Sequence, residues 1–337
     1  SDVEGKTILK IAEEEAFNFA EVDDLGTVRF DNTYLGKHIK AVLNLPLVDA
    51  AAIKAANFKI AVDAVNSTGG IFIPALLEAL GVQTIYKLYC EPTGEFPHNP
   101  EPLPENLTAI ADKIKETGAD LGIVVDPDVD RLAFVCEDGA MFGEEYTLVA
   151  VSDYVLQHTP GNTVSNLSST ISLREVTNRY AGSNYEASAV GEVNVVNKMK
   201  ETQAVIGGEG NGGVIYPELH YGRDALVGVG LFLTQLAKAN MTTSELRATY
   251  PNYFISKNKI QLSPEMDVDA ILSAVQNEYA NQEIDTTDGV KIYFGSEWAH
   301  LRKSNTEPII RIYSESESEE KANQLAFDIM ETIRSLS

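Results

Sequence analysis

The stretch Leu121–Arg131, LGIVVDPDVDR, decides the fold because it joins a buried strand to an acidic turn. Its first five residues are apolar, the pattern of a fully buried strand. Three aspartates then occupy every second position as the chain leaves the strand, at Asp126, Asp128 and Asp130. Carboxylates packed this closely repel one another unless a hard divalent cation neutralises them. The stretch therefore predicts a Mg²⁺ site, with coordination positions left open for water or a phosphate oxygen.

Two other interpretations of the acidic turn stay open. An EF-hand calcium loop also begins with alternating aspartates, and Glu137 falls at the twelfth position counted from Asp126. However, Arg131 occupies the sixth position, where that loop needs Gly, and the flanking residues have the pattern of strands. The second alternative is a solvated acidic turn that binds no ion. We expect the magnesium site.

Length and composition limit the classes of protein. The 337 residues exceed a single ordinary core and predict two to four domains, and 44% hydrophobic residues indicate a globular protein. The formal charge of −24 argues against nucleic acid or an anionic membrane as a partner. No apolar run reaches eighteen residues, and the two cysteines, Cys90 and Cys136, lack ligand spacing. We expect a cytoplasmic protein in a reducing compartment.

Around the acidic turn, the hydrophobic period alternates between strand and helix. The pattern predicts a first βαβαβ unit, a second unit of similar order and a last α+β module. The expected fold class is α/β: successive α/β/α domains with mixed, largely parallel sheets, then a C-terminal α+β domain with an antiparallel sheet. Thr242 and Glu245 fit a capping box. Further expected elements are strands at 58–63, 82–90 and 204–206, and helices at 71–80, 144–156, 171–180, 224–238, 268–279 and 319–335.

A glycine-rich run follows the expected strand 204–206. Five of the seven residues in Gly207–Gly213 are glycine, so we expect a loop whose backbone can approach a ligand closely. Glu209 adds an acceptor and Asn211 both a donor and an acceptor, which are the groups needed to bind sugar hydroxyls. The alternative is a flexible hairpin turn without a ligand. The run lacks GxxxxGK and is therefore not an ATP-binding P-loop.

A basic and hydroxyl-rich cluster lies between two expected strands of the last module. It contains Arg302, Ser304, Asn305 and Thr306, and Arg311 follows shortly after. The two arginines can fork around a phosphate dianion, while hydroxyl and backbone N–H groups complete its hydrogen bonds. We expect a phosphate site; the alternative is a hairpin loop with surface ion pairs.

The three motifs, in this order, resemble the α-D-phosphohexomutases, the family of phosphoglucomutase, phosphomannomutase and phosphoglucosamine mutase. The resemblance rests on DPDVDR at 126–131, GEGNGG at 208–213 and RKSNTEP at 302–308, with support from DAVNSTGG at 63–70 and VGE at 190–192. It covers nearly the whole chain. It implies domains at 1–45 (remnant or connector of a first domain), 46–142 (metal), 143–252 (sugar) and 253–337 (phosphate).

The resemblance also implies roles for residues. The three aspartates would hold Mg²⁺, and Arg131 would act as the catalytic residue beside the transferring phosphate. Arg302, Ser304, Asn305, Thr306 and Arg311 would hold the phosphate that does not react. The implied substrate is a phosphorylated hexose, with hexose 1,6-bisphosphate as intermediate and activator; the oligomeric state is open. The residues expected to contact the sugar are Val190, Gly191, Glu209, Gly210, Asn211 and Arg223.

The sequence departs from the family in two respects. The family's phosphoserine lies in a T-A-S-H-N-P-like loop, which does not occur in residues 1–337. We therefore expect a piece of a longer mutase that is inactive by itself. In addition, Asn211, Gly212 and Gly213 stand where many glucose- or mannose-specific members have a Ser-Gly-His-like continuation, which favours glucosamine phosphate.

Two competing functions remain. A haloacid-dehalogenase-like phosphatase also has Asp126-x-Asp128 after a strand, but Asp130 argues against it. A non-catalytic sugar-phosphate binding protein is the other alternative. The five histidines (38, 98, 158, 220 and 300) show no metal spacing, and we expect no direct chemistry from them; His220 and Arg223 are expected to line the cleft.

Overall fold

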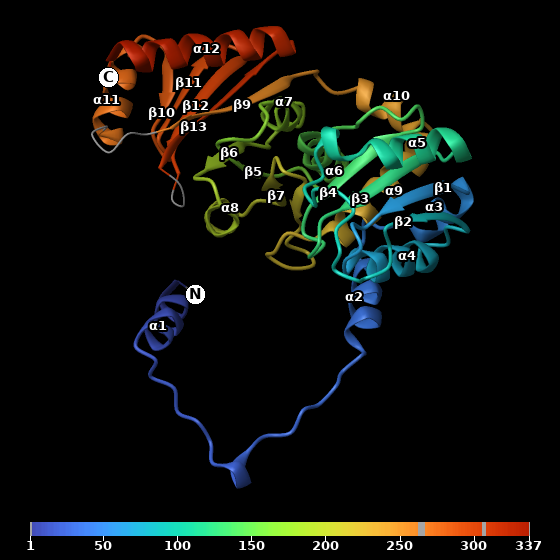
Figure 1. Ribbon diagram of the computed structural model, residues 1–337. Coiled ribbons are helices and arrows are strands. Elements are labelled where there is room, and N and C mark those ends of the chain that lie inside the picture. The colour runs from blue at the N-terminus through green and yellow to red at the C-terminus, as the bar shows by residue number, and fades with distance from the viewer. Residues whose placement is uncertain (1, 262–266, 305–307, 337) are drawn as a thin grey trace. The chain divides into compact units, whose positions relative to one another are not determined.

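The computed structural model describes residues 2–261, 267–304 and 308–336 (Figure 1). The chain forms two compact units, which meet in the sequence after Lys37. The first unit, Ser1–Lys37, contains helix α1 (Asp2–Glu13) and the short 3₁₀ helix η1 (Val22–Asp24), and its side chains are almost all exposed. Helix α2 (Tyr34–Leu43) begins in this unit and ends in the second, His38–Ser337. The second unit contains every residue of the expected sites.

The first sheet of the second unit contains the acidic turn. Its strand order is β2-β1-β3-β4, in which β1 pairs in parallel with β2 and β3, and only β4 is antiparallel. The turn joins β3 to β4, so both strands position the aspartates. The elements are α3 (Ala50–Ala56), β1 (Lys59–Asp63), α4 (Gly69–Ala79), β2 (Thr84–Leu88), η2 (Pro104–Asn106), α5 (Thr108–Thr117), β3 (Leu121–Val125) and β4 (Leu132–Cys136).

The second sheet repeats this arrangement. Its order is β6-β5-β7-β8, again with two parallel pairs and a last antiparallel strand. The hairpin β7–β8 thus corresponds to the hairpin β3–β4 that bears the aspartates. The elements are α6 (Glu144–His158), β5 (Thr163–Asn166), α7 (Ser172–Thr177), β6 (Tyr185–Ser188), α8 (Glu192–Thr202), β7 (Ile206–Glu209), β8 (Gly213–Ile215), α9 (Ala225–Ala239) and α10 (Thr243–Ala248).

The third sheet is antiparallel throughout, in the order β10-β11-β12-β13-β9, and α12 lies across one face of it (Figure 1). Its own apolar cluster packs between this sheet and the helices. The expected fold class is therefore confirmed. The elements are β9 (Phe254–Gln261), α11 (Val268–Glu278), β10 (Glu283–Asp285), β11 (Val290–Phe294), β12 (Glu297–Lys303), β13 (Ile309–Ser316) and α12 (Glu319–Leu336).

A continuous apolar core joins the first two sheets. Phe134 of β4 stacks on Phe232 of α9 with ring centroids 3.7 Å apart, and Phe142 meets Phe232 edge-on at 5.2 Å. All three rings are completely buried. Because close-packed interiors transmit displacement rather than absorb it, the two hairpins share one rigid support.

Three local predictions compare differently with the structure. The capping box of Thr242 and Glu245 is confirmed at the start of α10. The helix expected at 171–180 is shorter, because α7 covers only Ser172–Thr177. The strand expected at 204–206 is displaced: Gly207 and Gly208 are not loop residues but pair with β5 on one side and β8 on the other. Ladder hydrogen bonds here outweigh the low strand preference of glycine.

None of the helices in the described ranges is both long and apolar enough to cross a bilayer.

Candidate functional site

The acidic turn brings its three carboxylates together. Oxygen atoms of Asp126, Asp128 and Asp130 lie within 4.8 Å of one another. The turn is held by one carboxylate oxygen of Asp126, which accepts the backbone N–H groups of Asp130 at 3.1 Å and Arg131 at 3.0 Å. Val129, which lies between Asp128 and Asp130, adopts φ +63°, a conformation that is strained for a β-branched residue. Backbone strain at this turn accompanies a precise arrangement of ligand atoms.

Burial and mutual repulsion make these carboxylates suited to a cation. Burial raises the pKa of Asp126 to about 7, and the nearby Asp130 and Asp128 contribute to the increase. The carboxylate oxygen Oδ1 of Asp130 is buried and has no hydrogen-bond partner among the described residues. Three converging carboxylates, one of them with such an orphaned oxygen, form an oxygen ligand set that fits Mg²⁺.

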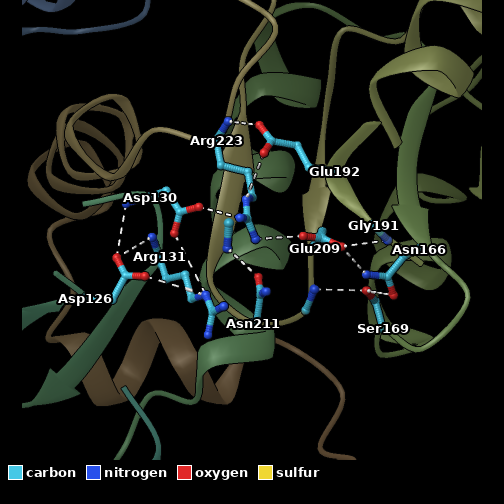
Figure 2. Close-up of polar contacts among 12 residues, drawn as sticks. Asp126, Asp130, Arg131, Asn166, Ser169, Gly191, Glu192, Glu209, Asn211 and Arg223 are labelled. Atoms are coloured by element: carbon cyan, nitrogen blue, oxygen red, sulfur yellow. Dashed lines mark hydrogen bonds and ion pairs between the residues drawn. The ribbon is translucent and has the colours of Figure 1, made fainter. Parts of the chain in front are cut away.

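Glu209 lies at the end of β7 and is only 5% exposed. Figure 2 shows its carboxylate among three donors: Asn166 Nδ2 at 2.8 Å, the Gly191 backbone N–H at 3.3 Å and an Arg223 guanidinium nitrogen at 2.7 Å. Next to it, the Gly210 N–H donates to the Ser169 hydroxyl at 2.9 Å. The buried carboxylate is thus fixed from three directions in one orientation.

Arg223 connects the β7–β8 hairpin, residues 206–215, to the acidic turn. Besides Glu209, its guanidinium forms an ion pair with Asp130 (Figure 2) and lies 3.6 Å from a Glu192 carboxylate oxygen. Its backbone N–H donates to Glu192 at 2.9 Å. One arginine therefore neutralises carboxylates from both hairpins.

The backbones of the two hairpins also meet. The Leu132 N–H donates to the Gly212 carbonyl at 3.0 Å, and Arg131 forms an antiparallel bridge with Gly213. Asn211, at the tip of the hairpin, accepts the Gly213 N–H at 3.2 Å. The acidic turn and the β7–β8 hairpin are consequently one structural feature. The expected glycine loop is a defined hairpin, so its residues are ordered by pairing rather than flexible.

The expected phosphate residues lie on the third sheet. Arg302 on β12 and Arg311 on β13 are register partners, so their side chains project from the same face. The Arg302 Nε atom is buried without a hydrogen-bond partner among the described residues. Ser304 is 7% exposed, and its N–H donates to the Ile309 carbonyl at 3.1 Å. The other two expected residues, Asn305 and Thr306, lie outside the described residues.

The third sheet contacts the segment between β6 and α8 of the second. The Val190 N–H donates to the Asp288 carboxylate at 3.0 Å. His300 on β12 forms hydrogen bonds at both ring nitrogens: Nε2 donates to the Asp288 carbonyl at 2.7 Å, and Nδ1 lies 2.9 Å from the Ser168 hydroxyl. Of the two expected sugar residues here, Val190 therefore donates its backbone N–H to Asp288, and Gly191 donates its own to Glu209.

Sequence reasoning missed several residues of this site. Asn166, Ser169, Glu192 and Asp288 contact its expected members, yet only Glu192 belongs to a quoted motif. Asn166 ends β5 at the edge where β7 delivers Glu209, and ligands of open α/β sheets bind at the carboxyl ends of strands. That rule could have identified Asn166; no comparable pattern marks Asp288.

Family models match nearly the whole second unit. Phosphoglucomutase/phosphomannomutase, alpha/beta/alpha domain II, matches residues 36–139; domain III of the same family matches 143–253; and its C-terminal domain matches 258–332. The chain belongs to the phosphoglucomutase/phosphomannomutase family. The expected membership of the phosphohexomutases, which are intramolecular phosphotransferases, is confirmed.

Individual relatives agree with this family. The phosphoglucomutase/phosphomannomutase of Thermococcus kodakarensis is 36% identical over 92% of this chain and 67% of its own length. A probable phosphoglucosamine mutase of Methanopyrus kandleri is 33% identical over 93% of this chain and 68% of its length. A crystal structure of a family protein from Burkholderia thailandensis shares the fold with a TM-score of 0.83 at 24% identity, covering 98% of this chain and 69% of that one.

Proposed function

We propose that this chain supplies the metal, sugar and phosphate sites of a mutase that moves a phosphate between the 1- and 6-hydroxyls of a hexose. The observation that supports the proposal best is the Arg223 side chain, which pairs with Asp130 of the acidic turn and with Glu209 of the β7–β8 hairpin. A reaction that transfers a phosphoryl group to a sugar hydroxyl requires these two sites side by side.

In this proposal the acidic turn serves the transferring phosphoryl group. Asp126, Asp128 and Asp130 would hold Mg²⁺, which neutralises charge on phosphate oxygens when bound. Arg131 follows directly, and its guanidinium Nε lies 3.6 Å from Asp126 and has no hydrogen-bond partner among the described residues. Its positive charge can stabilise negative charge that develops on the phosphate in the transition state.

The sugar would lie against the hairpin. Glu209 accepts hydrogen bonds from hydroxyls, Asn211 both accepts and donates, and the backbone of Val190, Gly191 and Gly210 lies beside them. A mutase must hold the hexose in two opposite orientations, one for each phosphate position. Acceptors that recognise paired hydroxyls, rather than one end of the ring, permit both. Hexose 1,6-bisphosphate would be the intermediate and activator.

The phosphate that does not react would be held by the third sheet. Arg302 and Arg311 project from one face, and a dianion between two guanidinium groups gains charge-assisted hydrogen bonds. Ser304, Asn305 and Thr306 would complete the site. In a chain of net charge −24, two adjacent arginines offer an anion an attraction that the rest of the surface opposes.

The phosphoryl donor of the proposed mechanism is a phosphoserine in a T-A-S-H-N-P-like loop, and such a loop does not occur in residues 1–337. We therefore propose that the 337-residue chain alone binds hexose phosphates and does not interconvert them. Calorimetric titration with glucosamine-, mannose- and glucose-6-phosphate, in saturating Mg²⁺, measures binding, and a coupled assay of each 1-phosphate measures turnover. Adding a segment with the serine loop should restore turnover.

Each outcome of this experiment has a meaning. Binding without turnover, and turnover after the serine segment is added, support the proposal. Interconversion by the 337-residue chain alone would overturn the proposed route through a phosphoserine, and absence of binding would overturn the site. Among the sugars we propose glucosamine phosphate, from the Asn211-Gly212-Gly213 continuation; this fails if glucosamine phosphate binds most weakly.

A further inference from the structure

A second group of metal-ligating side chains lies beside the proposed sugar site. It consists of His38 on α2, His220 in the segment after β8, and Asp224, the N-cap of α9. One donor atom of each lies within 4.8 Å of the other two. These residues belong to none of the motifs that define the proposed function, and His38 is 182 positions from His220 in the sequence.

The geometry of the group is convergent. The Nε2 atoms of His38 and His220 lie 2.8 and 3.0 Å from the same carboxylate oxygen, Oδ2 of Asp224. The other carboxylate oxygen accepts the helix N–H groups of Leu226 at 2.8 Å and Val227 at 3.2 Å. The helix N–H groups therefore fix the carboxylate through Oδ1, and both imidazole rings are directed at Oδ2.

Exposure differs among the three side chains. The Asp224 carboxylate is only 6% exposed, whereas His38 and His220 are 30% and 44% exposed. A metal ion can reach the open side of the group from solvent, where an anionic ligand is already oriented.

We propose that His38, His220 and Asp224 form a second divalent-metal site that takes a borderline-soft ion such as Zn²⁺. Two imidazole nitrogens and one carboxylate are the ligands of tetrahedral zinc, with water in the fourth position. Ligand atoms around such an ion are about 3.3 Å apart, as follows from bonds of about 2.0–2.1 Å. The two separations from Asp224, 2.8 and 3.0 Å, need only a small opening, and the ligand atoms of the two histidines lie within 4.8 Å of each other. The oxygen-only acidic turn prefers Mg²⁺ instead.

Such an ion would connect two distant parts of the chain next to the sugar site. It would join α2, which leads into the second unit, to the first residue before α9. Asp224 directly follows Arg223, whose guanidinium pairs with Glu209 and Asp130. The metal would therefore fix the backbone from which Arg223 reaches both hairpins. Because the ion binds the folded chain, it should also raise the melting temperature.

Cobalt provides a direct test, because tetrahedral Co²⁺ absorbs visible light and Mg²⁺ does not. The metal-stripped 337-residue chain is saturated with Mg²⁺ and then titrated with Co²⁺ at pH 7.5. We expect one equivalent to bind with tetrahedral absorption bands and to be displaced by Zn²⁺. His38→Gln and His220→Gln should each weaken Co²⁺ binding by about tenfold or more, whereas Asp128→Asn and the exposed-histidine control His158→Gln should leave it unchanged.

A variant that retains ligation guards against misfolding. His220→Cys keeps a ligand and should add a thiolate-to-Co²⁺ charge-transfer band in the near ultraviolet. That band supports the proposal independently of the Gln variants. The proposal is overturned if the wild-type chain binds no Co²⁺ beyond what Asp128→Asn removes. It is also overturned if His38→Gln, His220→Gln and His220→Cys all give the same absorption and affinity as wild type.

Discussion

Leu132 donates its backbone N–H to the Gly212 carbonyl at 3.0 Å, and so joins the strand that follows the acidic turn to the tip of the β7–β8 hairpin. Leu132 begins β4 of the first sheet, and Gly212 lies in the turn that joins β7 to β8 of the second sheet. A hydrogen bond between backbones cannot be lost by rotation of a side chain, and the stacked Phe134 and Phe232 pack β4 against α9. The two proposed sites should therefore move as one body.

Gly212→Ala tests this connection. Gly212 has φ +91°, and a Cβ atom there would lie 2.4 Å from the Leu132 carbonyl oxygen. We expect a loss of stability on the order of 2 kcal/mol or more, from backbone strain plus displacement of the neighbouring strand. Thermal unfolding measures the loss, and calorimetry should show weaker hexose phosphate binding.

The matched control is Gly182→Ala. Gly182 has a similar φ of +82°, but apart from its chain neighbours no described residue has an atom within 4 Å of the position of its Cβ. It should cost about 1 kcal/mol, the conformational strain alone, and leave ligand binding unchanged. Equal costs for the two variants would contradict the importance of the contact between the hairpins.

Arg223→Met should affect stability and binding together. The Arg223 side chain is 14% exposed, and its removal leaves the buried Glu209 and the partly buried Asp130 without their shared cation. Breaking such a pair costs on the order of 3 kcal/mol. We expect a lower midpoint in urea unfolding and at least about tenfold weaker hexose phosphate binding. Arg179→Met, on an exposed arginine, is the control and should change neither quantity.

Asp128→Asn should separate metal binding from stability. Asp128 is exposed, but its charge adds to the repulsion within the acidic turn. Without metal, the variant should be as stable as wild type or slightly more so, because one charge of the three is removed. In Mg²⁺ the wild-type melting temperature should rise and that of the variant should not. Asp112→Asn, an exposed carboxylate on α5, should retain the full Mg²⁺ response.

The parts of the site that the sequence predicted are those formed by residues adjacent in the chain. The acidic turn follows its own strand, so alternation and charge repulsion were enough to identify it. Arg302 and Arg311 were expected to act on one phosphate, and the structure makes them register partners on adjacent strands. In both cases the residues that form the group are close in the sequence, so the sequence pattern was enough to identify the group, and the fold determines only where it lies.

What the sequence did not predict depends on the packing of distant segments. Asp130 and Arg223 are 93 positions apart and meet only because the two hairpins adjoin. His38 and His220 are 182 positions apart, far from any spacing that is typical of metal ligands. Gly207 was expected in a loop and lies in a strand, because neighbouring strands on both sides supply hydrogen bonds that local preference does not foresee. Tertiary contacts outweigh propensity at such positions.

His300 should make stability depend on pH. It is 1% exposed, and burial lowers its pKa to about 4, from an ordinary value of 6.5. Its ring lies 2.7 Å from the Asp288 carbonyl and 2.9 Å from the Ser168 hydroxyl, so the neutral ring donates to the carbonyl and accepts from the hydroxyl. Protonation would remove the acceptor that Ser168 needs and bury a charge.

The sign follows from proton counting. Between pH 6.5 and 4 the unfolded chain binds a proton at His300 that the folded chain does not, so the free energy of unfolding falls as pH falls through this window. The loss attributable to His300 should be on the order of 3 kcal/mol at pH 4. Urea unfolding followed by fluorescence of Trp298, the single tryptophan, reports on the same sheet. His300→Gln should flatten the pH dependence by this amount; parallel curves for variant and wild type would show that His300 is not the titrating group.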